Sequence, residues 1–318
     1  MPEALHECQR HVAGRGRRDR DEHHLVADQL DEPAIPGGDE ILRHRVATPS
    51  GDYDATIATV VGLVRAAERQ LGVDGSVGIG TPGSLSRATG RLRGSNSLCL
   101  NDRPIKQDLE AALGRPVRIA NDANCFAPSE AIDGAGEGAP VVFGAILGTG
   151  VGAGVVVRGG VLEGPNAIAG EWGHNPLPWL RDDERPGPGC YCGRASCIET
   201  WLSGPGIERD HAKATGASLS ASEIAARSAA GDIACAATIT RYEERLARAL
   251  AHVINLLDPD VIVLGGGMSN VESLYANVPR RWGAWIFSDR VDTRLVRNAH
   301  GDSSGVRGAA RLWDYSPG

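Results

Sequence analysis

Lysine and long hydrophobic runs are what this sequence has least of. Its two lysines are Lys106 and Lys213, so contacts to an anionic ligand must come mostly from arginine or from backbone amides. No stretch approaches the roughly 20 apolar residues that span a bilayer, and the amino terminus has no hydrophobic region of a secretory signal. These absences predict a cytoplasmic protein without a membrane partner.

The charge balance is acidic, with a formal net charge of −7 and a pI near 5.7. This balance argues against a duplex-binding surface, so no nucleic-acid partner is expected. The 318 residues suffice for about two domains if a domain averages roughly 150 residues. Hydrophobic residues at 42% and charged residues at 23% predict a folded core rather than global disorder.

Seven cysteines occur, at positions 8, 99, 125, 190, 192, 197 and 235. Their number is odd, and three of them lie within one short segment. This distribution is typical of an intracellular protein with a metal site rather than of a disulfide scaffold.

The first 36 residues differ from the rest of the chain. They carry 13 charged residues and four of the nine histidines, and no apolar period of 2 or 3.6 is sustained. We expect a disordered extension. A metal-binding tract is the weaker alternative, because His6, His11, His23 and His24 lack a regular ligand spacing.

Beyond residue 37, strand and helix patterns alternate. The spacing of Ile57, Val60, Val61 and Val64 predicts an amphipathic helix over residues 53–71. Other helices are predicted at 105–113 and 246–257, and strands at 40–46, 76–80, 116–120, 141–147, 151–157 and 261–264. This alternation indicates an α/β protein.

Three cysteines, Cys190, Cys192 and Cys197, follow His174 in the string CYCGRASC. Three thiolates and one imidazole complete a tetrahedral zinc shell with no open position, which is the structural rather than the catalytic arrangement. Gly193 lets the backbone turn so that Cys197 can approach the first two cysteines. The alternative is three free thiols beside an unrelated histidine, which the close spacing disfavours.

The glycine run LGTGVGAG, residues 147–154, lies between two apolar strands. Glycine permits bends that bring backbone N–H groups against an anion, although a hairpin with close strand packing explains the run equally well. A strand follows the run, which excludes a Rossmann fingerprint, and no Lys-Ser/Thr closes it, which excludes a Walker A loop. The candidate phosphate contacts are Gly148, Thr149, Gly150, Gly152 and Gly154.

Two further candidates follow predicted buried strands. Gly265, Gly266 and Gly267 lie where open α/β sheets bind ligands, and they suit an adenine ring, although a plain strand-to-helix turn explains them nearly as well. Asp122 stands between a strand and a helix. There it is either a general base for a substrate hydroxyl or a helix N-cap.

Glu171 and Glu199 flank the predicted zinc ligands. A zinc ion that joins residue 174 to residues 190–197 would also bring these two carboxylates together. Carboxylates and amides that converge in this way predict a polyhydroxylated ligand, such as a sugar.

The strings NDAN, LGTGVGAG, GEWGHNPLP, CYCGRASCIET, LDPDVIVLGGGMSN and HGDSSGVRGAA together resemble the ROK family of sugar kinases, over residues 37–313. The nearest resemblance is to its bacterial fructokinase branch. It implies an actin-like ATPase fold with two α/β domains around a cleft, and ATP, Mg²⁺ and structural Zn²⁺ as cofactors. It also implies Asp122 as catalytic base, Asn96, Asn121, Glu171, His174 and Glu199 as sugar contacts, Gly148–Gly154 as a phosphate loop, Gly265–Gly267 as an adenosine-facing segment, and His174, Cys190, Cys192 and Cys197 as zinc ligands.

The chain departs from the family pattern in two places. The family's Asp-x-Gly-Gly-Thr loop, which contacts ATP phosphates and helps place magnesium, is missing. We therefore interpret residues 1–36 as a replaced or out-of-frame segment, and expect the first strand to be lost and its neighbour to be left unpaired. The other departure is Ser196, which stands where the zinc loop usually has glycine. Serine is tolerable there if its φ is negative.

We expect an enzyme that phosphorylates the 6-hydroxyl of a hexose, above all fructose. The rivals are a sugar-binding protein impaired in catalysis by the missing loop, and a repressor, for which residues 1–36 supply no helix-turn-helix. The predicted division is an anomalous segment at 1–36, an N-terminal α/β domain at 37–121, and a C-terminal α/β domain at 122–318 with the zinc loop 174–197. Hexose and ATP are the expected partners, with a homodimer as one possible assembly.

Overall fold

The computed structural model of the protein describes residues 22–26, 42–301 and 304–313, and of residues 22–26 the backbone alone. Within these ranges, the largest sheet has the order β11-β10-β7-β8-β9. Strand β10 is parallel to both β7 and β11, whereas β8 is antiparallel to β7 and β9. These strands are β7 (Val141–Leu147), β8 (Val151–Val157), β9 (Gly160–Val161), β10 (Val261–Gly265) and β11 (Arg294–Arg297).

Three smaller strand pairs lie in the amino-terminal part of the chain. They are β1 (Glu22–Val26) with β2 (Arg43–Ala47), antiparallel; β3 (Val77–Thr81) with β6 (Val117–Asn121), parallel; and β4 (Ser84–Leu85) with β5 (Leu92–Arg93), antiparallel.

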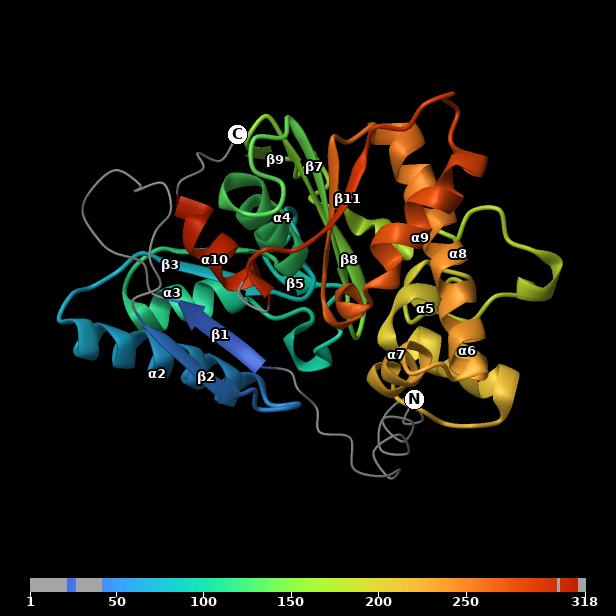
Figure 1. Ribbon diagram of the computed structural model, residues 1–318. Coiled ribbons are helices and arrows are strands. Elements are labelled where there is room, and N and C mark those ends of the chain that lie inside the picture. Colours follow the sequence, from blue (N-terminus) through green and yellow to red (C-terminus); the bar gives the residue numbers. More distant parts are fainter. Residues whose placement is uncertain (1–21, 27–41, 302–303, 314–318) are drawn as a thin grey trace.

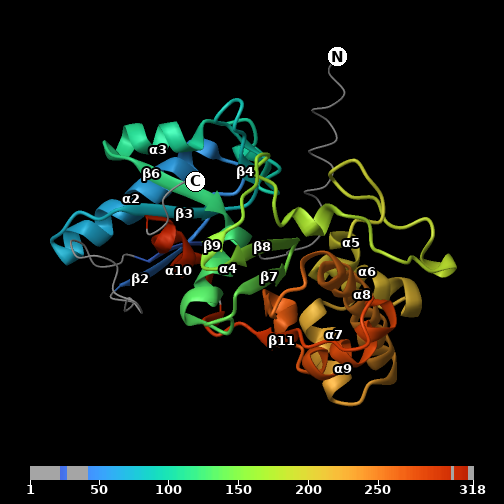
Figure 2. The ribbon, with the colours of Figure 1, turned by 90° about the horizontal axis from the view of Figure 1, so that it is seen from above.

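Helices cover the strands on both sides of the molecule. They are α2 (Tyr53–Leu71), α3 (Ile105–Leu113), α4 (Asp122–Asp133), α5 (Glu199–Leu202), α6 (Gly204–Thr215), α7 (Ala221–Ala229), α8 (Ile233–Leu257), α9 (Ser273–Trp282) and α10 (Ser304–Ala310). Short 3-10 turns are η1 (Leu98–Leu100), η2 (Glu171–His174), η3 (Asp182–Glu184), η4 (Gly267–Asn270), η5 (Gly283–Trp285) and η7 (Arg311–Trp313). Helices α2 and α3 lie in one half, α5 to α9 lie in the other, and α4 lies between them with β7 and β8 (Figures 1 and 2). The predicted α/β class is confirmed. No helix in the described ranges has the length and apolarity to cross a membrane.

Buried apolar side chains form three clusters. One joins α2 and α3 to β3 and β6, and includes Val64, Leu109 and Val117. The largest surrounds α8, whose Leu246 and Leu250 are fully buried. A small third cluster, around Phe126 and Val263, fills the space between α4 and the strands β7 and β10. The third cluster therefore fixes α4 against the large sheet.

Several elements begin and end where the sequence predicts. Helices α2 and α3 and strand β7 have the predicted bounds. Helix α2 starts because the Asp52 side chain accepts a hydrogen bond from the Ala55 N–H, and it ends at Gly72 with φ +74°. Helix α8 is longer than predicted: it begins at Ile233, after Asp232, whose side chain accepts a hydrogen bond from the Cys235 N–H.

The expectation that the first strand is lost is wrong for residues 22–26. They form β1, which pairs with all five residues of β2 in an antiparallel ladder. A ladder needs only backbone N–H and C=O groups, so this strand forms without the family's sequence. A segment of five residues is also too short to show a sustained apolar period. The rest of residues 1–36 lies outside the described ranges.

Helix α4 is held at its carboxyl end by the last helix of the chain. Glu130 is fully buried, and its carboxylate accepts hydrogen bonds from the N–H of Ala299 at 2.9 Å and the hydroxyl of Ser304 at 2.7 Å. Asp133 pairs with Arg307 at 2.8 Å on α10. We call these contacts the α4–α10 clamp. It ties the carboxyl end of α4 to a helix that also packs on β3.

Candidate active site

A cavity of about 240 Å³ opens at the amino end of α4, beside the turn between β7 and β8. The predicted catalytic and sugar-binding residues all line it, although they come from four separate segments of the chain. They are Asn96, Asn121, Asp122, Glu171, His174 and Glu199, and they are joined by Gly148, Thr149, Gly150 and Gly152 of the predicted phosphate loop. The cavity is therefore one site, and most of its predicted members meet there.

Asn121, not Asp122, is the N-cap of α4. Its side-chain oxygen accepts a hydrogen bond from the Ala123 N–H at 2.9 Å, and its amide nitrogen donates to the Gly83 carbonyl at 3.0 Å. Both ends of this side chain therefore hold protein groups, although Asn121 also lines the cavity. The neighbouring carboxyl of Asp122 stays available at the floor of the site.

Asp122 is exposed to the solvent that fills the cavity, while protein atoms surround it closely on its other sides. This burial raises the pKa of its carboxyl to about 6. The Ala123 N–H opposes the rise, and the negative charge of Glu171 adds to it. A carboxylate of this kind is more basic than an ordinary aspartate.

Turn η2 carries Glu171 and His174 into the cavity because two glycines let it lie directly on β8. A Cβ at Gly170, where φ is +91°, would lie 2.0 Å from the Ala153 carbonyl oxygen. A Cβ at Gly173 would lie 1.9 Å from the Val151 carbonyl oxygen. Larger residues at either position would push Glu171 and His174 off the strand.

Glu199 supports the turn between β7 and β8. Its carboxylate accepts a hydrogen bond from the Val151 N–H at 3.0 Å, and a Cβ at Gly150 would lie 2.7 Å from the same oxygen. Burial raises the pKa of Glu199. Within the described residues, the N–H groups of Thr149 and Gly150 donate to no protein acceptor. These two amides are therefore the ones that an anion could use.

The remaining predicted glycines lie outside the cavity and serve packing. A Cβ at Gly154 would lie 2.4 Å from the Ala123 carbonyl oxygen, so this glycine lets α4 approach β8 closely. A Cβ at Gly265 would meet Phe126 of α4 at 2.5 Å, and one at Gly266 would lie 2.6 Å from the Leu147 carbonyl oxygen. Gly265–Gly267 thus lie at the end of β10, next to the end of β7, and their predicted contact with adenosine stays a prediction.

The four predicted metal ligands meet in space. The ligand atoms of His174, Cys190, Cys192 and Cys197 all lie within 4.8 Å of one another. The Sγ atoms of Cys192 and Cys197 are 3.6 Å apart, and Cys190 Sγ is 3.6 Å from His174 Nδ1. A tetrahedral zinc ion with Zn–S near 2.3 Å and Zn–N near 2.0 Å requires edges of about 3.8 Å and about 3.6 Å. A disulfide would instead need about 2.05 Å. The group therefore fits zinc.

Ser196 does not have the negative φ on which its tolerance depends. Its φ is +61°, in the left-handed region, and its side chain is buried. The neighbouring hydrogen bonds from Ser196 N–H to the Pro188 carbonyl and from Leu177 N–H to the Ser196 carbonyl, both 2.8 Å, hold it there. Serine at this position carries a strain that glycine would avoid.

A buried ionic cluster fastens the zinc segment to helix α8. Glu184 accepts hydrogen bonds from Arg245 at 2.9 Å and Arg248 at 2.7 Å. Burial acts to raise the pKa of Glu184, but these guanidinium groups outweigh it and lower the pKa to about 2. Arg245 also lies over the ring of Trp201, two residues from Glu199. The segment 174–197 is therefore anchored at its ligand end and at its middle.

Two residues whose polar side chains line the cavity were missed by sequence reasoning. Asn124 lines it from the first turn of α4, and Tyr191 lines it from between two cysteines. The signal for Tyr191 lay in the motif itself, because a metal shared by His174 and Cys190 must bring the residue after Cys190 close to that histidine. The position of Asn124, two residues after Asp122, gives no comparable signal.

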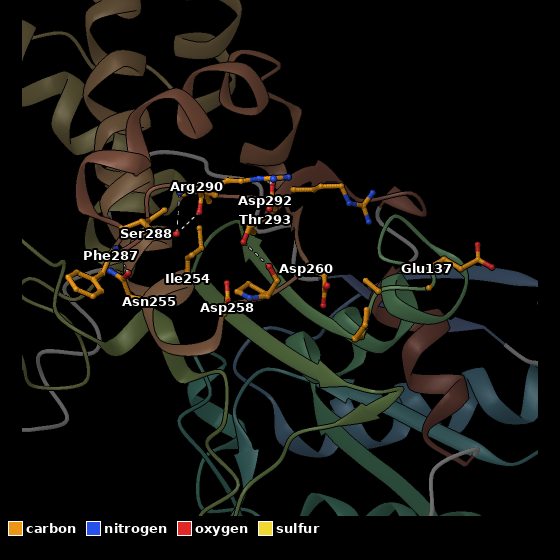
Figure 3. A pocket seen from close by; sticks show the side chains of 17 residues that line it. Glu137, Ile254, Asn255, Asp258, Asp260, Phe287, Ser288, Arg290, Asp292 and Thr293 are labelled. Carbon is orange, nitrogen blue, oxygen red and sulfur yellow. Dashed lines mark hydrogen bonds and ion pairs between the residues drawn. The ribbon is translucent and has the colours of Figure 1, made fainter.

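A larger cavity, of about 850 Å³, lies elsewhere, where β7, β10 and β11 begin (Figure 3). Some of its charged groups pair within the protein: Arg290 meets Asp292 at 2.7 Å, and Asp260 accepts a hydrogen bond from the Val141 N–H at 2.9 Å. Ligands of open α/β sheets bind instead at the opposite edge, beyond the carboxyl ends of the strands. The smaller cavity, with its converging carboxylates, is therefore the candidate active site.

Comparison with known sequences gives consistent findings. The sequence profile of the ROK family matches residues 37–315. The N-acetyl-D-glucosamine kinase of Photobacterium profundum is 43% identical over 278 residues, which cover 86% of this chain and 92% of that protein. The N-acetyl-D-glucosamine kinase of Pasteurella multocida is 41% identical over 274 residues, which cover 85% and 90%.

Solved structures with the same fold belong to the same family. The ROK hexokinase of Thermus thermophilus superposes with a TM-score of 0.75 at 29% identity, over 90% of this chain and 96% of that one. The ROK family glucokinase of Streptomyces griseus, solved with glucose and AMPPNP, also gives a TM-score of 0.75, at 25% identity over 91% and 96%. These likenesses confirm the actin-like ATPase fold predicted from the sequence.

Proposed function

Since the chain belongs to the ROK family, we propose that it is an ATP-dependent sugar kinase whose substrate is N-acetyl-D-glucosamine. The observation that carries the proposal is the cavity, where Asp122 stands among Glu171, His174 and Glu199. The choice of sugar is supported by relatives that are N-acetyl-D-glucosamine kinases at 38–43% identity. Fructose, which the motif resemblance favours, is the alternative hexose.

The reaction follows from these residues. Asp122 accepts the proton of the sugar 6-hydroxyl as that oxygen attacks the γ-phosphorus of ATP. The new O–P bond forms while the bond between the γ-phosphorus and the β–γ bridging oxygen breaks, and ADP leaves. The N–H groups of Thr149 and Gly150, which donate to no acceptor among the described residues, would neutralise the transferring phosphoryl group. Magnesium would enter with the nucleotide.

Zinc would hold the sugar side of the cavity. Bound by His174, Cys190, Cys192 and Cys197, it would fill a closed tetrahedral shell and therefore act on structure rather than on chemistry. Coordination through Nδ1 of His174 leaves Nε2 for contacts within the cavity. The same side chain would thus serve the metal and the wall of the cavity.

A second candidate function is sugar binding with little or no turnover. The observation that favours it is the missing Asp-x-Gly-Gly-Thr loop, which leaves phosphate contact to the turn at residues 148–150. The predicted sugar contacts all line the cavity, so we expect sugar binding not to depend on that loop.

An ADP-release assay with N-acetyl-D-glucosamine, fructose, glucose and mannose tests the proposal, with calorimetric titration of each sugar alongside. We expect the highest kcat/KM with N-acetyl-D-glucosamine. A higher value with fructose would transfer the proposal to that sugar. Tight binding of N-acetyl-D-glucosamine without ADP release would establish the second candidate instead.

A further inference from the structure

Tyr191 occupies a position that neither the zinc motif nor the proposed reaction uses. Its hydroxyl lies 3.0 Å from Nε2 of His174, and the two rings meet edge to face with centroids 5.1 Å apart. Although it sits between two zinc-ligand cysteines, the side chain is 60% exposed and lines the sugar cavity.

The direction of the hydrogen bond follows from the metal site. Nδ1 of His174 lies 3.6 Å from Cys190 Sγ, so a zinc ion in this group would bind Nδ1 and leave the ring proton on Nε2. Nε2–H then donates to the phenol oxygen of Tyr191. The O–H of Tyr191 then remains free to donate a hydrogen bond to a ligand, because the ring lines the cavity.

The geometry of a pyranose identifies which part of the sugar this donor can reach. C5 carries C6, and the ring atom opposite C5 is C2. When the 6-hydroxyl points at Asp122 on α4, the C2 substituent must therefore face another wall of the cavity. Tyr191 and His174 belong to such a wall, which is formed by η2 and the zinc segment rather than by α4.

We propose that Tyr191 is a specificity-determining residue whose phenol O–H donates a hydrogen bond to the substituent at C2 of the bound sugar. The inference rests on the proposed function, in which that substituent is an acetamido group. An amide carbonyl oxygen is a stronger acceptor than a hydroxyl, so the contact favours the 2-acetamido sugar over the 2-hydroxy sugar.

The experiment compares wild type with Tyr191→Phe, which removes the hydroxyl and keeps the ring. Calorimetric Kd values for N-acetyl-D-glucosamine and glucose are measured without ATP, together with zinc per chain. We expect the Kd of N-acetyl-D-glucosamine to rise about three- to tenfold, as for one lost neutral hydrogen bond, and that of glucose to rise by less than about twofold. Zinc content should stay at the wild-type value.

Tyr53→Phe is the matched control, because it removes a hydroxyl that donates to Asp108 on α3, away from the cavity. It should leave both Kd values unchanged. An equal rise for both sugars in Tyr191→Phe would show that Tyr191 only positions His174, and lost zinc would show a purely structural role. Unchanged Kd values would remove Tyr191 from the site. Each of these outcomes overturns the inference while leaving the proposed function intact, whereas a wild type that binds no N-acetyl-D-glucosamine overturns both.

Discussion

Burial of the Asp122 carboxyl lowers the stability of the folded protein and raises the basicity of the carboxylate. Its pKa of about 6 means that the folded site disfavours the ionised form, and the same effect makes that form a better proton acceptor. At neutral pH such a group lowers the free energy of unfolding, while its higher basicity would favour removal of a proton from an attacking hydroxyl. Its two roles can be separated by experiment.

Asp122→Asn should abolish phosphotransfer and spare sugar binding. The amide keeps the size of the side chain but cannot accept the proton, so kcat should fall by about 10²–10⁴, while the Kd of the sugar changes by less than about threefold. ADP release and calorimetry measure the two quantities. Asp54→Asn, the same change at an exposed position of α2, is the control. Comparable kcat values in wild type and Asp122→Asn would exclude a general-base role.

The pH dependence of activity and stability should both reflect the raised pKa of Asp122. The base is the ionised form, so kcat/KM should rise with pH through about 6 and level off above it. Between the ordinary value of 3.8 and about 6 the folded state binds more protons than the unfolded state, so this group's contribution to stability falls as pH rises. Asp122→Asn should therefore have a higher Tm than wild type at pH 8, and a smaller advantage at pH 4.5. Thermal unfolding at both pH values checks this, and a pH-independent difference would contradict it.

Ser196→Gly should stabilise the protein. The left-handed conformation costs a non-glycine residue about 1–2 kcal/mol, whereas glycine adds about 0.4–1 kcal/mol of unfolded-state entropy. The first effect is larger, so the free energy of unfolding should rise by roughly 0.5–1 kcal/mol. Denaturant unfolding measures it. Ser228→Gly on α7, where the residue is helical, should destabilise, and a matching loss at residue 196 would show that its φ carries no strain.

At the scale of elements, the segment 174–197 has little regular structure of its own. It contains only the turn η3 and the end of η2 between its ligands. Two isolated backbone bridges and Glu184 hold it, and a metal at its ligand end would hold it further. A zinc ion would stabilise the sugar cavity by holding residues that no helix or strand holds.

Removal of zinc should accordingly lower stability and sugar affinity together. We expect one zinc per chain in the purified protein, and we expect chelation or Cys192→Ser to lower Tm, because the binding free energy of a structural metal is part of the folding free energy. Elemental analysis and thermal unfolding measure these effects. Cys99→Ser, at a cysteine outside the group, should retain zinc. A Cys192→Ser variant with full zinc would exclude the assigned ligand set.

The sequence predicted elements well where one physical signal dominates. An apolar stripe and two end signals define α2, and the spacing of cysteines defines the metal group. Prediction from the sequence failed where a residue's conformation or role is decided by a contact with a distant part of the chain. The φ of Ser196 depends on Pro188 and Leu177, the pairing of β1 depends on β2, and the packing role of Gly154 depends on α4. The predicted domain boundary at residues 121/122 stays a prediction.

At the scale of the whole molecule, the predicted sugar contacts are all present, whereas the predicted phosphate contacts are incomplete. All predicted sugar contacts line one cavity, whereas the family's first phosphate loop is missing from the sequence. The pairing of β1 with β2 gives β2 a partner, whereas β3 pairs with β6 alone among the described residues.

We therefore predict that this chain binds sugar better than it phosphorylates it. Loss of one oxyanion donor typically costs about 10²–10³ in rate, and the missing loop supplies several. Replacing residues 1–36 by a strand and an Asp-x-Gly-Gly-Thr loop should raise kcat by at least that factor. The same replacement with alanines in place of the two glycines is the control. A wild-type kcat near the roughly 10 per second median of enzymes would show that the loop is dispensable.

Because the α4–α10 clamp fixes the carboxyl end of α4, any rotation of the helix about that end moves Asp122 at the other end. The 12 residues of α4 span about 18 Å, with Asp122 at one end and Asp133, held by α10, at the other. A rotation of about 10° at the clamped end would move the Asp122 carboxyl by about 3 Å, which is the difference between a hydrogen bond and no contact. If Asp122 acts as the proposed base, its alignment with the sugar hydroxyl is set partly by ion pairs that no substrate touches. Substitutions at either end of α4 should then change turnover.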